Sequence, residues 1–414
     1  MLVRGAMHRV GAQLLGRLLS ESLPVASRSP CDCGHTARYH DRRPRQLLTA
    51  LGPVQFERAY YHCWHCGRGH RQRDRELDVE GTACSPGVRR MLAVVGSESS
   101  FEQGREQLAL LAGLEVTTKA VERQAEAIGA DIAAREQAEI RRAKQLQLAE
   151  VCAPAVAVLY IEMDGTGVPV VAAELAGRAG KLAGQAARTR EVKLGCVFTQ
   201  SGVDENGWPV RDQASTTYVA AIETAEEFGL RLYTEAWRRG WSRANKKVVL
   251  GDGAVWIWNL ADQHFPNAIQ IVDLYHARQH LWELSAKLFA TEPQPRKRWA
   301  TQLQHKLDQG KVEAVLKVLR KFAPLNAEMA HLLDNEAEYF ERNAERMRYP
   351  QFRAQGLFIG SGVVEAGCKT VVGARLKQSG MFWTVRGANA ILALRCNRLS
   401  GKFEDYWESR ARAA

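Results

Sequence analysis

The chain has 414 residues, of which 46% are hydrophobic and 25% are charged. That length allows two or three domains and that apolar content allows packed cores, so the composition excludes a largely disordered chain. The 57 lysines and arginines outnumber the 46 aspartates and glutamates, and the net charge of +11 favours a polyanionic partner. No run of about eighteen apolar residues would span a bilayer, and charges interrupt the first segment too often for a secretory signal, so we expect a cytoplasmic protein.

Four of the nine cysteines are grouped near the amino terminus, within residues 1–84. An odd number of cysteines without an export signal indicates reduced thiols rather than a disulfide framework. Cys31 and Cys33 precede a segment that predicts a strand, a Gly-Pro turn and a second strand, and Cys63 and Cys66 follow it. This arrangement predicts a zinc-ribbon-like hairpin, because structural Zn²⁺ takes four tetrahedral Cys or His ligands.

The first cysteine pair departs from the usual spacing of such a site. One residue separates Cys31 from Cys33, whereas two separate Cys63 from Cys66. Either the first knuckle is distorted or His35 replaces Cys31 as a ligand. The alternative interpretation is a metal-free hairpin. The other five cysteines lie singly in apolar settings, and we expect them in the core.

Residues 85–153 predict a helical region. The apolar residues follow helical spacing up to a break at Gly113, and the pattern restarts after Thr117, which predicts a helix-turn-helix-like pair. Lys119 and Arg123 lie on one face of the second helix, as in a recognition helix that enters the major groove of DNA. An ordinary helical hairpin gives the same pattern and is the alternative.

After Pro154 the chain predicts an α/β core. Candidate elements follow in the order strand, strand, strand, helix, strand, helix, strand over residues 155–274. The first strand ends in Asp-Gly at Asp164, and the fourth ends in Asp-Gly at Asp252. Both acids are therefore expected at the carboxyl ends of strands, where open α/β sheets usually bind ligands. The alternative is that each Asp-Gly marks only a turn.

A third acid, Glu365, follows Gly360 and Gly362 and leads a helical pattern. This residue would bring a third carboxylate to the same edge of the sheet, or else it caps its helix. Three carboxylates suit Mg²⁺, which prefers hard oxygen ligands. Lys369 lies one helical turn beyond Glu365, so it is expected either to contact phosphate or to form an ion pair with Glu365.

Further basic residues are candidates for contact with DNA phosphates. A segment rich in glycine and alanine between the first two strands predicts a DNA-clamping loop, or else an ordinary solvated loop. The candidates are Arg178 and Lys181 in that segment, and Lys369, Arg375 and Lys377 after Glu365.

Three stretches of the chain carry a specific likeness to a known family. They read VVLGDGAVWIWNLADQHFPNAIQIVDLYHARQHL, GSGVVEAGCKTVVGARLKQSGMFW and GANAILALRC. Together they resemble the ISKra-type insertion-sequence transposases, a bacterial relative of the Mutator-like DDE group. The resemblance covers nearly the whole chain, since the amino-terminal cysteines and the middle helices also fit that family.

The resemblance implies a DNA transposase with an RNase H-like catalytic core, in which the first and fourth strands are neighbours. Asp164, Asp252 and Glu365 would be its metal-binding triad. Two Mg²⁺ ions, or Mn²⁺ in their place, would support cleavage of the transposon ends and joining of the freed 3′ hydroxyl to target DNA. The Zn²⁺ of the cysteine hairpin would be structural.

The resemblance also assigns roles to the segment after the last strand. Asp273 and His276 would form the Asp-x-x-His signature of Mutator-like transposases and support the active site. The helical spacing of His276 and His280 would alternatively suit a metal, although no second pair of soft donors lies close in the sequence. The following helices would be the all-helical insertion that these transposases carry before the last acid.

The expected fold is thus an α/β RNase H-like core with an all-helical insertion, preceded by two smaller regions. The regions are the zinc-ribbon-like residues 1–84, the helical DNA-binding residues 85–153, the first part of the core at 154–279, the insertion at 280–355 and the carboxy-terminal helices of the core at 356–414.

The resemblance further implies partners and a place in the cell. The expected partners are the terminal inverted repeats, target DNA and further copies of the chain in a dimer or larger assembly, at the bacterial nucleoid. Two other classes remain: an RNase H-fold nuclease or resolvase without strand transfer, and a domesticated DNA-binding protein without catalysis. The three intact acids argue against the latter.

Overall fold

The computed structural model describes residues 2–21, 25–152, 154–180 and 186–413, and it divides the chain into two compact units. Unit 1 combines residues 1–133 with residues 401–414, and unit 2 holds residues 134–400. Residues 401–414 therefore belong to the amino-terminal unit, whereas the sequence grouped them with the core. Within the described ranges, no helix is both long and apolar enough to cross a membrane.

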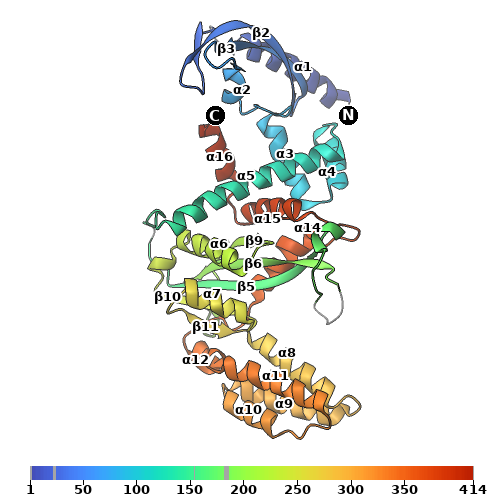
Figure 1. Ribbon diagram of the computed structural model, residues 1–414, viewed down its shortest axis with the longest axis vertical. Coiled ribbons are helices and arrows are strands. Elements are labelled where there is room, and N and C mark those ends of the chain that lie inside the picture. The colour runs from blue at the N-terminus through green and yellow to red at the C-terminus, as the bar shows by residue number, and fades with distance from the viewer. Residues whose placement is uncertain (1, 22–24, 153, 181–185, 414) are drawn as a thin grey trace. The chain divides into compact units, whose positions relative to one another are not determined.

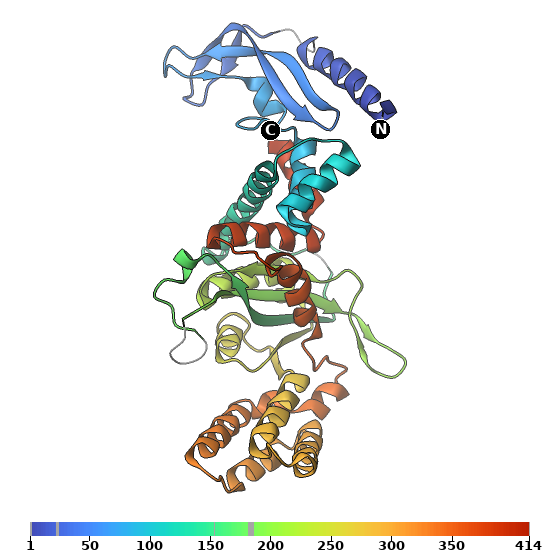
Figure 2. The ribbon, with the colours of Figure 1, turned by 90° about the vertical axis from the view of Figure 1, so that its right-hand side faces the viewer.

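Unit 1 begins with a helix that packs on an antiparallel sheet (Figures 1 and 2). The sheet order is β1-β2-β3-β4, and helix α1 (Leu2–Glu21) lies against β3. The strands are β1 (Arg28–Pro30), β2 (Thr36–Thr49), β3 (Gly52–His62) and β4 (Gly69–His70). The β2–β3 hairpin alternates buried and exposed residues because one face packs on a small core that includes Leu47, Val54 and Phe56.

The rest of unit 1 is helical, and Thr117 starts its longest helix. The backbone N–H of Ala120 donates to the Thr117 Oγ at 3.1 Å, and Gly113 ends the preceding turn with a φ of 67°. The helices are α2 (Gln72–Glu76), α3 (Pro86–Glu98), α4 (Phe101–Gln107), the π-helical η1 (Leu108–Ala112), α5 (Thr118–Lys144) and α16 (Phe403–Ala413). The expected helix, turn, helix order is thus present in α4, η1 and α5.

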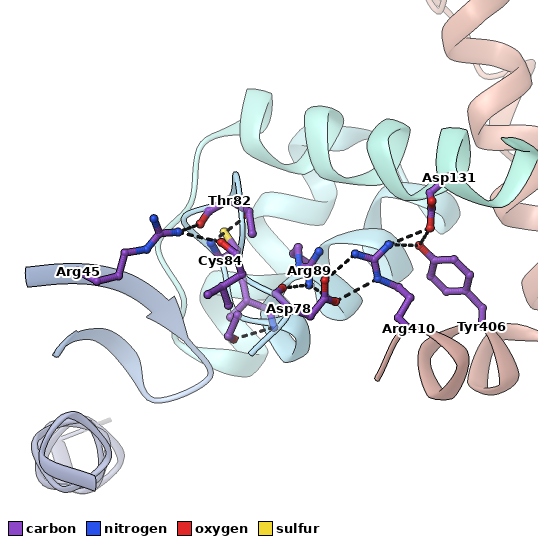
Figure 3. A network of polar contacts seen from close by, with 11 residues as sticks. Arg45, Asp78, Thr82, Cys84, Arg89, Asp131, Tyr406 and Arg410 are labelled. Carbon is purple, nitrogen blue, oxygen red and sulfur yellow. Dashed lines mark hydrogen bonds and ion pairs between the residues drawn. The ribbon is translucent and has the colours of Figure 1, made fainter. Parts of the chain in front are cut away.

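Ion pairs and hydrogen bonds hold α16 in unit 1, as Figure 3 shows. The Arg410 guanidinium donates to both carboxylate oxygens of Asp78, at 3.1 and 2.8 Å, and to Asp131 at 2.8 Å. The Tyr406 hydroxyl donates to the same Asp131 at 2.7 Å. Arg89 forms a second ion pair with Asp78. The carboxy-terminal helix is therefore tied to Asp78 and Asp131, two segments of the amino-terminal half, and Arg89 pairs with the same Asp78.

Unit 2 contains a mixed five-stranded sheet of order β11-β10-β5-β6-β9. Its strands are β5 (Val158–Pro169), β6 (Thr189–Gln200), β9 (Thr217–Ala221), β10 (Lys246–Gly251) and β11 (Ile269–Val272). Strands β5, β6 and β9 pair antiparallel, whereas β10 pairs parallel with both β5 and β11. The first and fourth strands, β5 and β10, are therefore neighbours, as expected.

Helices cover both faces of this sheet because the strands are apolar on both sides. Gly195 in β6 meets Phe228 and Leu232 of α6 on one face, whereas Cys196 meets Gly367 on the other. The helices that follow the strands or return to the sheet are α6 (Ala225–Arg238), α7 (Val255–His264), α13 (Gly362–Gly367), the π-helical η5 (Cys368–Gly373), α14 (Ala374–Leu376) and α15 (Val385–Leu399).

A helical cluster separates β11 from α13 (Figure 1). Its elements are α8 (Leu274–Leu288), α9 (Pro293–Asp308), α10 (Val312–Lys321), α11 (Ala327–Arg342), the 3-10 turn η4 (Ala344–Met347) and α12 (Tyr349–Ala354). The cluster shares one apolar core with the sheet, since Leu281, Leu303 and Phe340 are buried together with Ile161 and Val249. Short elements elsewhere in unit 2 are η2 (Ala172–Leu175), the hairpin strands β7 (Gly202–Val203) and β8 (Pro209–Val210), and η3 (Trp241–Arg243).

Candidate active site

The register of β5 and β10 places two of the expected acids side by side. Leu250 pairs with Glu162 in the parallel ladder, so two residues further on Asp252 lies level with Asp164. The expectation that Asp164 ends its strand is wrong, because β5 continues to Pro169 by pairing with β6 alone. Asp164 nevertheless lies where β10 stops, which leaves its carboxylate beside an open sheet edge.

The Asp164 carboxylate is partly buried and held by two donors. The backbone N–H of Gly165 donates to Oδ1 at 2.6 Å, and the Cys368 thiol donates to Oδ2 at 3.3 Å. Burial raises the pKa of Asp164, the nearby Asp252 charge raises it further, and His276 acts in the opposite direction. Cys368 thus lies at the site rather than in the core. Cys152, which the sequence also assigned to the core, is exposed.

Glu162 is a fully buried acid that the sequence analysis did not single out. Its Oε2 accepts a hydrogen bond from the backbone N–H of Val364 at 2.7 Å, and its Oε1 has no hydrogen-bond partner among the described residues. Burial raises the pKa of Glu162 to about 8, and the Asp273 and Glu365 charges act in the same direction. Because side chains alternate along a strand, Glu162 and Asp164 share the face on which α13 packs.

The helical cluster supports the loop that carries Asp252. The Tyr339 hydroxyl of α11 donates to the Asp252 carbonyl at 3.0 Å, and the Tyr339 ring stacks on His280 at 4.1 Å. The Nδ1 atom of His280 in turn lies 2.8 Å from a Glu336 carboxylate oxygen, so this ring nitrogen already has a protein partner. The sequence placed Tyr339 in a helix but gave no signal that it reaches the Asp252 loop.

Glu365 is exposed on α13, and the helix changes from α to π geometry about one turn later. Gly367 lets this helix lie close to the sheet, because a Cβ there would meet Leu194 at 2.9 Å. The π-helical η5 follows directly, and the buried Arg395 of α15 donates to its backbone carbonyls at Thr370 and, at 2.7 Å, Val371. Single π-helical turns leave such carbonyls without regular partners, so Arg395 stabilises the irregular segment.

Asp273 connects the last strand to the loop before Glu365. Its Oδ1 accepts hydrogen bonds from the backbone N–H groups of Tyr275 and His276 at 2.6 and 3.0 Å, which caps α8. Its Oδ2 accepts from the Ser361 hydroxyl and, at 2.6 Å, from the Ser361 N–H. Asp273 is almost fully buried. The structure therefore gives this acid a positioning role, with His276 one turn into the helix.

The three expected acids do not form a single ligand set among the described residues. Among the described residues, the only group of three or more His, Cys, Asp or Glu ligand atoms within 4.8 Å of one another is a set of four cysteines. Asp164 and Asp252 are close enough for their charges to interact, and Glu365 raises the pKa of both Glu162 and Cys368. Asp164 and Asp252 thus lie together where β10 ends.

Most of the expected DNA-contacting residues are exposed, and one is not. The exposed ones are Lys119, Arg123, Arg178, Lys369 and Lys377. Arg375 is fully buried, with its guanidinium 4.9 Å from the Trp383 ring centre, so the expectation that it contacts phosphate is wrong. Lys181 lies outside the described residues. Within the described part of the chain, the structure records no ion pair between Glu365 and Lys369.

The four amino-terminal cysteines form a compact cluster. The Sγ atoms of Cys31 and Cys66 lie 3.6 Å apart, as do those of Cys33 and Cys63. Four ligands at a Zn–S distance of about 2.3 Å would lie roughly 3.8 Å from one another, so the cluster fits a tetrahedral zinc site. His35 stacks on His65 at 3.5 Å and is not part of the four-ligand set.

Backbone turns explain how an unequal pair of knuckles makes this cluster. The Gly34 N–H donates to the Cys31 carbonyl at 2.9 Å, and the Gly67 N–H donates to the Cys63 carbonyl at 2.9 Å. Both glycines have positive φ, of 83° and 69°. The first turn is one residue shorter than the second, which accommodates the single residue between Cys31 and Cys33. The Cys66 N–H donates to the Cys63 thiol and, against the effect of burial, lowers its pKa to about 6.

A protein-family model described as "Uncharacterised protein family (UPF0236)" matches residues 32–410, and the chain belongs to this family. Comparison with the curated proteins gives no match. A solved structure described as "Drosophila P element transposase strand transfer complex" is similar over 77% of this chain and 79% of that chain. The identity is 8% and the TM-score is 0.26, so this likeness supports no functional argument by itself.

Proposed function

We propose that unit 2 is the RNase H-like core of a DDE-type DNA transposase, with Asp164, Asp252 and Glu365 as its catalytic acids. The observation that carries the proposal is the level placement of Asp164 and Asp252 on neighbouring parallel strands, with α13 packed on the same face of the sheet. The neighbouring placement of the first and fourth strands, β5 and β10, supports this assignment. The family resemblance in the sequence, of the ISKra type, supports the specific activity.

The chemistry of these acids fits a divalent cation. Burial and neighbouring negative charge raise the pKa of Asp164, and Glu365 and Asp273 raise the pKa of Glu162. A bound cation would offset this repulsion and favour the ionised acids. Mg²⁺ held by Asp164, Asp252 and Glu365 would supply charge neutralisation at the scissile phosphate and activation of the attacking oxygen.

The other residues of the site hold these acids in place. Tyr339 fixes the Asp252 loop, and Asp273 fixes the Ser361 turn from which the Glu365 helix starts. Glu162 ties β5 to α13 through the Val364 N–H. Exposed Lys369 and Lys377 would contact DNA phosphates beside the site, and Lys377 already bonds the Thr166 hydroxyl of β5.

The remaining regions would bind DNA and organise the assembly. In this proposal the four-cysteine hairpin holds one structural Zn²⁺, and the Lys119 and Arg123 face of α5 contacts the terminal repeats. Helices α8 to α12 would be the all-helical insertion. Arg178 would contribute a phosphate contact from the segment after β5. Two ends must be brought together for transposition, so the active form would hold at least two copies of the chain.

Strand joining distinguishes a transposase from a nuclease of the same fold. The purified full-length chain is incubated with Mg²⁺, labelled DNA that carries its own element's ends, and a target plasmid. We expect cleavage at the ends and covalent transfer of the label to the plasmid, and neither product from end sequences that are scrambled. Cleavage of both DNAs without transfer would instead indicate a nuclease or resolvase, and binding without cleavage would indicate a DNA-binding protein.

A further inference from the structure

A pocket of about 610 Å³ lies beside the exposed Glu365 of the proposed active site. Its lining includes three aromatic side chains, Trp208, Tyr275 and Phe358, together with Glu365 and Arg353. The volume is within the range of pockets that bind small organic groups. Aromatic side chains do not bind Mg²⁺ or neutralise phosphate. Three of them in one pocket next to a proposed catalytic acid therefore indicate a different kind of ligand.

The inner wall of this pocket is rigid. The Phe358 ring packs edge-on against Tyr160 and Phe198, with ring centres 5.4 and 5.9 Å away. The buried Gln200 side chain accepts a hydrogen bond from the Tyr160 hydroxyl and donates to the Gly356 carbonyl at 2.8 Å. This network connects β5, β6 and the segment before α13. The position of Phe358 is therefore fixed by β5, the strand that carries Asp164, and by its neighbour β6.

Trp208 lines the pocket from the β7–β8 hairpin, which projects from the end of β6 (Figure 2). The Asp204 carboxylate accepts hydrogen bonds from the Trp208 N–H at 2.8 Å and the Asn206 N–H at 2.9 Å. The Asp204 N–H donates to the Trp208 carbonyl at 2.8 Å. A well-bonded turn therefore presents an indole that is 55% exposed. An exposed tryptophan on a fixed turn is typical of a binding residue.

Tyr275 and Arg353 complete the pocket. Tyr275 lies on the backbone of Gly360, where a Cβ would meet its ring at 2.9 Å, and the tyrosine is 63% exposed. The half-buried Arg353 side chain also lines the pocket. The pocket thus offers flat π surfaces and a cationic side chain, which match the faces and the acceptor edge of a nucleobase.

We propose that this pocket binds one unpaired nucleobase of the DNA strand held at the catalytic acids. The inference rests on the proposed function, because Glu365 lines the pocket and a strand at the acids must pass its opening. A base inside a duplex has both faces covered by its neighbours, so it has to leave the stack before Trp208 contacts it. The pocket would hold a base displaced near the cleavage point.

The test uses the full-length protein and DNA that contains 2-aminopurine, a fluorescent base that is quenched when it stacks on an aromatic ring. One duplex carries a single extrahelical 2-aminopurine, and a second duplex carries the same base paired. Binding is measured without added Mg²⁺, so that no strand is cut. The variants are Trp208→Ala, the ring-retaining Trp208→Phe, and Val210→Ala as a control on the same hairpin, where Val210 is 49% exposed and lies outside the pocket lining.

We expect the wild-type protein to bind the extrahelical duplex more tightly than the paired one and to quench its fluorescence. Trp208→Ala should reduce that preference by about 5- to 150-fold, the usual range for one base stacked on one ring, while Trp208→Phe and Val210→Ala keep most of it. Equal binding of the two duplexes by the wild type, or full preference in Trp208→Ala, would overturn the proposal. Parallel cleavage assays in Mg²⁺ test the catalytic proposal separately. If that proposal fails, the wild type and all three variants will not cleave the DNA, whatever their preference for the extrahelical base.

Discussion

Gly253, the residue after Asp252, makes a tight contact between the loop of the proposed active site and the helical cluster. Its φ is +98°, a conformation that L side chains rarely adopt, and a Cβ there would lie 2.6 Å from the Tyr339 ring. Tyr339 also bonds the Asp252 carbonyl, so the loop has little freedom to move away. The position of Asp252 therefore depends on a glycine beside it.

Gly253→Ala should lower the free energy of unfolding of unit 2 by more than backbone strain alone. The matched control is Gly380→Ala, where φ is +78° and no atom lies within 4 Å of the added Cβ. The control should cost about 1–3 kcal/mol from strain, and Gly253→Ala should cost more because Tyr339 must also shift. Urea unfolding measures the loss of stability in each variant, and a separate cleavage assay measures the effect on the proposed active site. Equal losses in the two variants would show that the Tyr339 contact contributes nothing.

At the residue scale the sequence predicted the placement of two acids, while their catalytic role stays a prediction. The Asp-Gly pairs singled out Asp164 and Asp252, and the register of β5 and β10 places them level with each other, although β5 continues past Asp164. Glu162 was missed because an acid inside an apolar strand has no pattern of its own. Arg375 was misassigned because a basic residue near Glu365 looks the same whether it is exposed or stacked on Trp383. Burial of a charged residue depends on contacts between distant segments, which spacing does not encode.

The cysteine hairpin has a small core that a bound ion would supplement. Four thiols within 4.8 Å of one another lie beside a cluster whose buried members are Ala37, Tyr61 and Cys63. A core this small supplies little hydrophobic stabilisation, and structural zinc commonly replaces it in small modules. In the proposed zinc site, the metal would help to maintain the backbone turns at Gly34 and Gly67.

Metal analysis of the purified protein should find about one Zn²⁺ per chain if the cluster is a single structural site. Cys66→Ser should lose the zinc and lower the melting temperature of unit 1, because one of four ligands is removed. Cys84→Ser, at a half-buried cysteine outside the cluster, should keep the zinc. A wild-type protein that is folded yet contains no zinc would exclude this role for the cluster.

The elements themselves were largely predictable, and their exact lengths were not. Short apolar runs of β5, β6 and β10 bounded by glycine indicated buried strands. The extension of β5 past Asp164 depends on β6, whose partner residues are distant in sequence. The π-helical η5 requires Arg395 from α15 to satisfy its carbonyls. Such tertiary hydrogen bonds change local geometry without changing the local sequence pattern.

At the scale of the whole molecule, the chain returns at its end to unit 1. Arg410 pairs with Asp78 and Asp131, a contact that residue spacing does not predict, since charged residues near a terminus are usually solvated. Burial opposes ionisation of Asp78, but hydrogen bonds from Arg410 and the charge of Arg89 outweigh it and hold the pKa of Asp78 below its usual value of 3.8. The network in Figure 3 therefore depends on an ionised Asp78.

Docking of α16 should weaken in acid. A carboxyl whose pKa is lowered in the folded state stabilises that state above its unfolded pKa, and the contribution is lost as the pH falls below 3.8 through the folded value. Asp78→Asn should therefore reduce the hydrogen-exchange protection of α16 at pH 6, and the difference from wild type should shrink toward pH 3. The control Asp32→Asn, in an exposed pair with Arg75, should change protection little. An α16 equally protected in wild type and Asp78→Asn at pH 6 would contradict the account.

The most direct test of the central claim is the single-turnover cleavage rate of a labelled element end in Mg²⁺. Asp164→Asn, Asp252→Asn and Glu365→Gln should each slow cleavage by more than about 100-fold, since even outer partners of metal ligands usually cost 10- to 100-fold. Their affinity for the same DNA should stay close to that of the wild type. Asp262→Asn, at an exposed acid on α7, should cleave normally. Cleavage near the wild-type rate in any of the three variants would remove that residue from the site, and near-normal cleavage by Asp164→Asn would contradict the proposed catalytic centre.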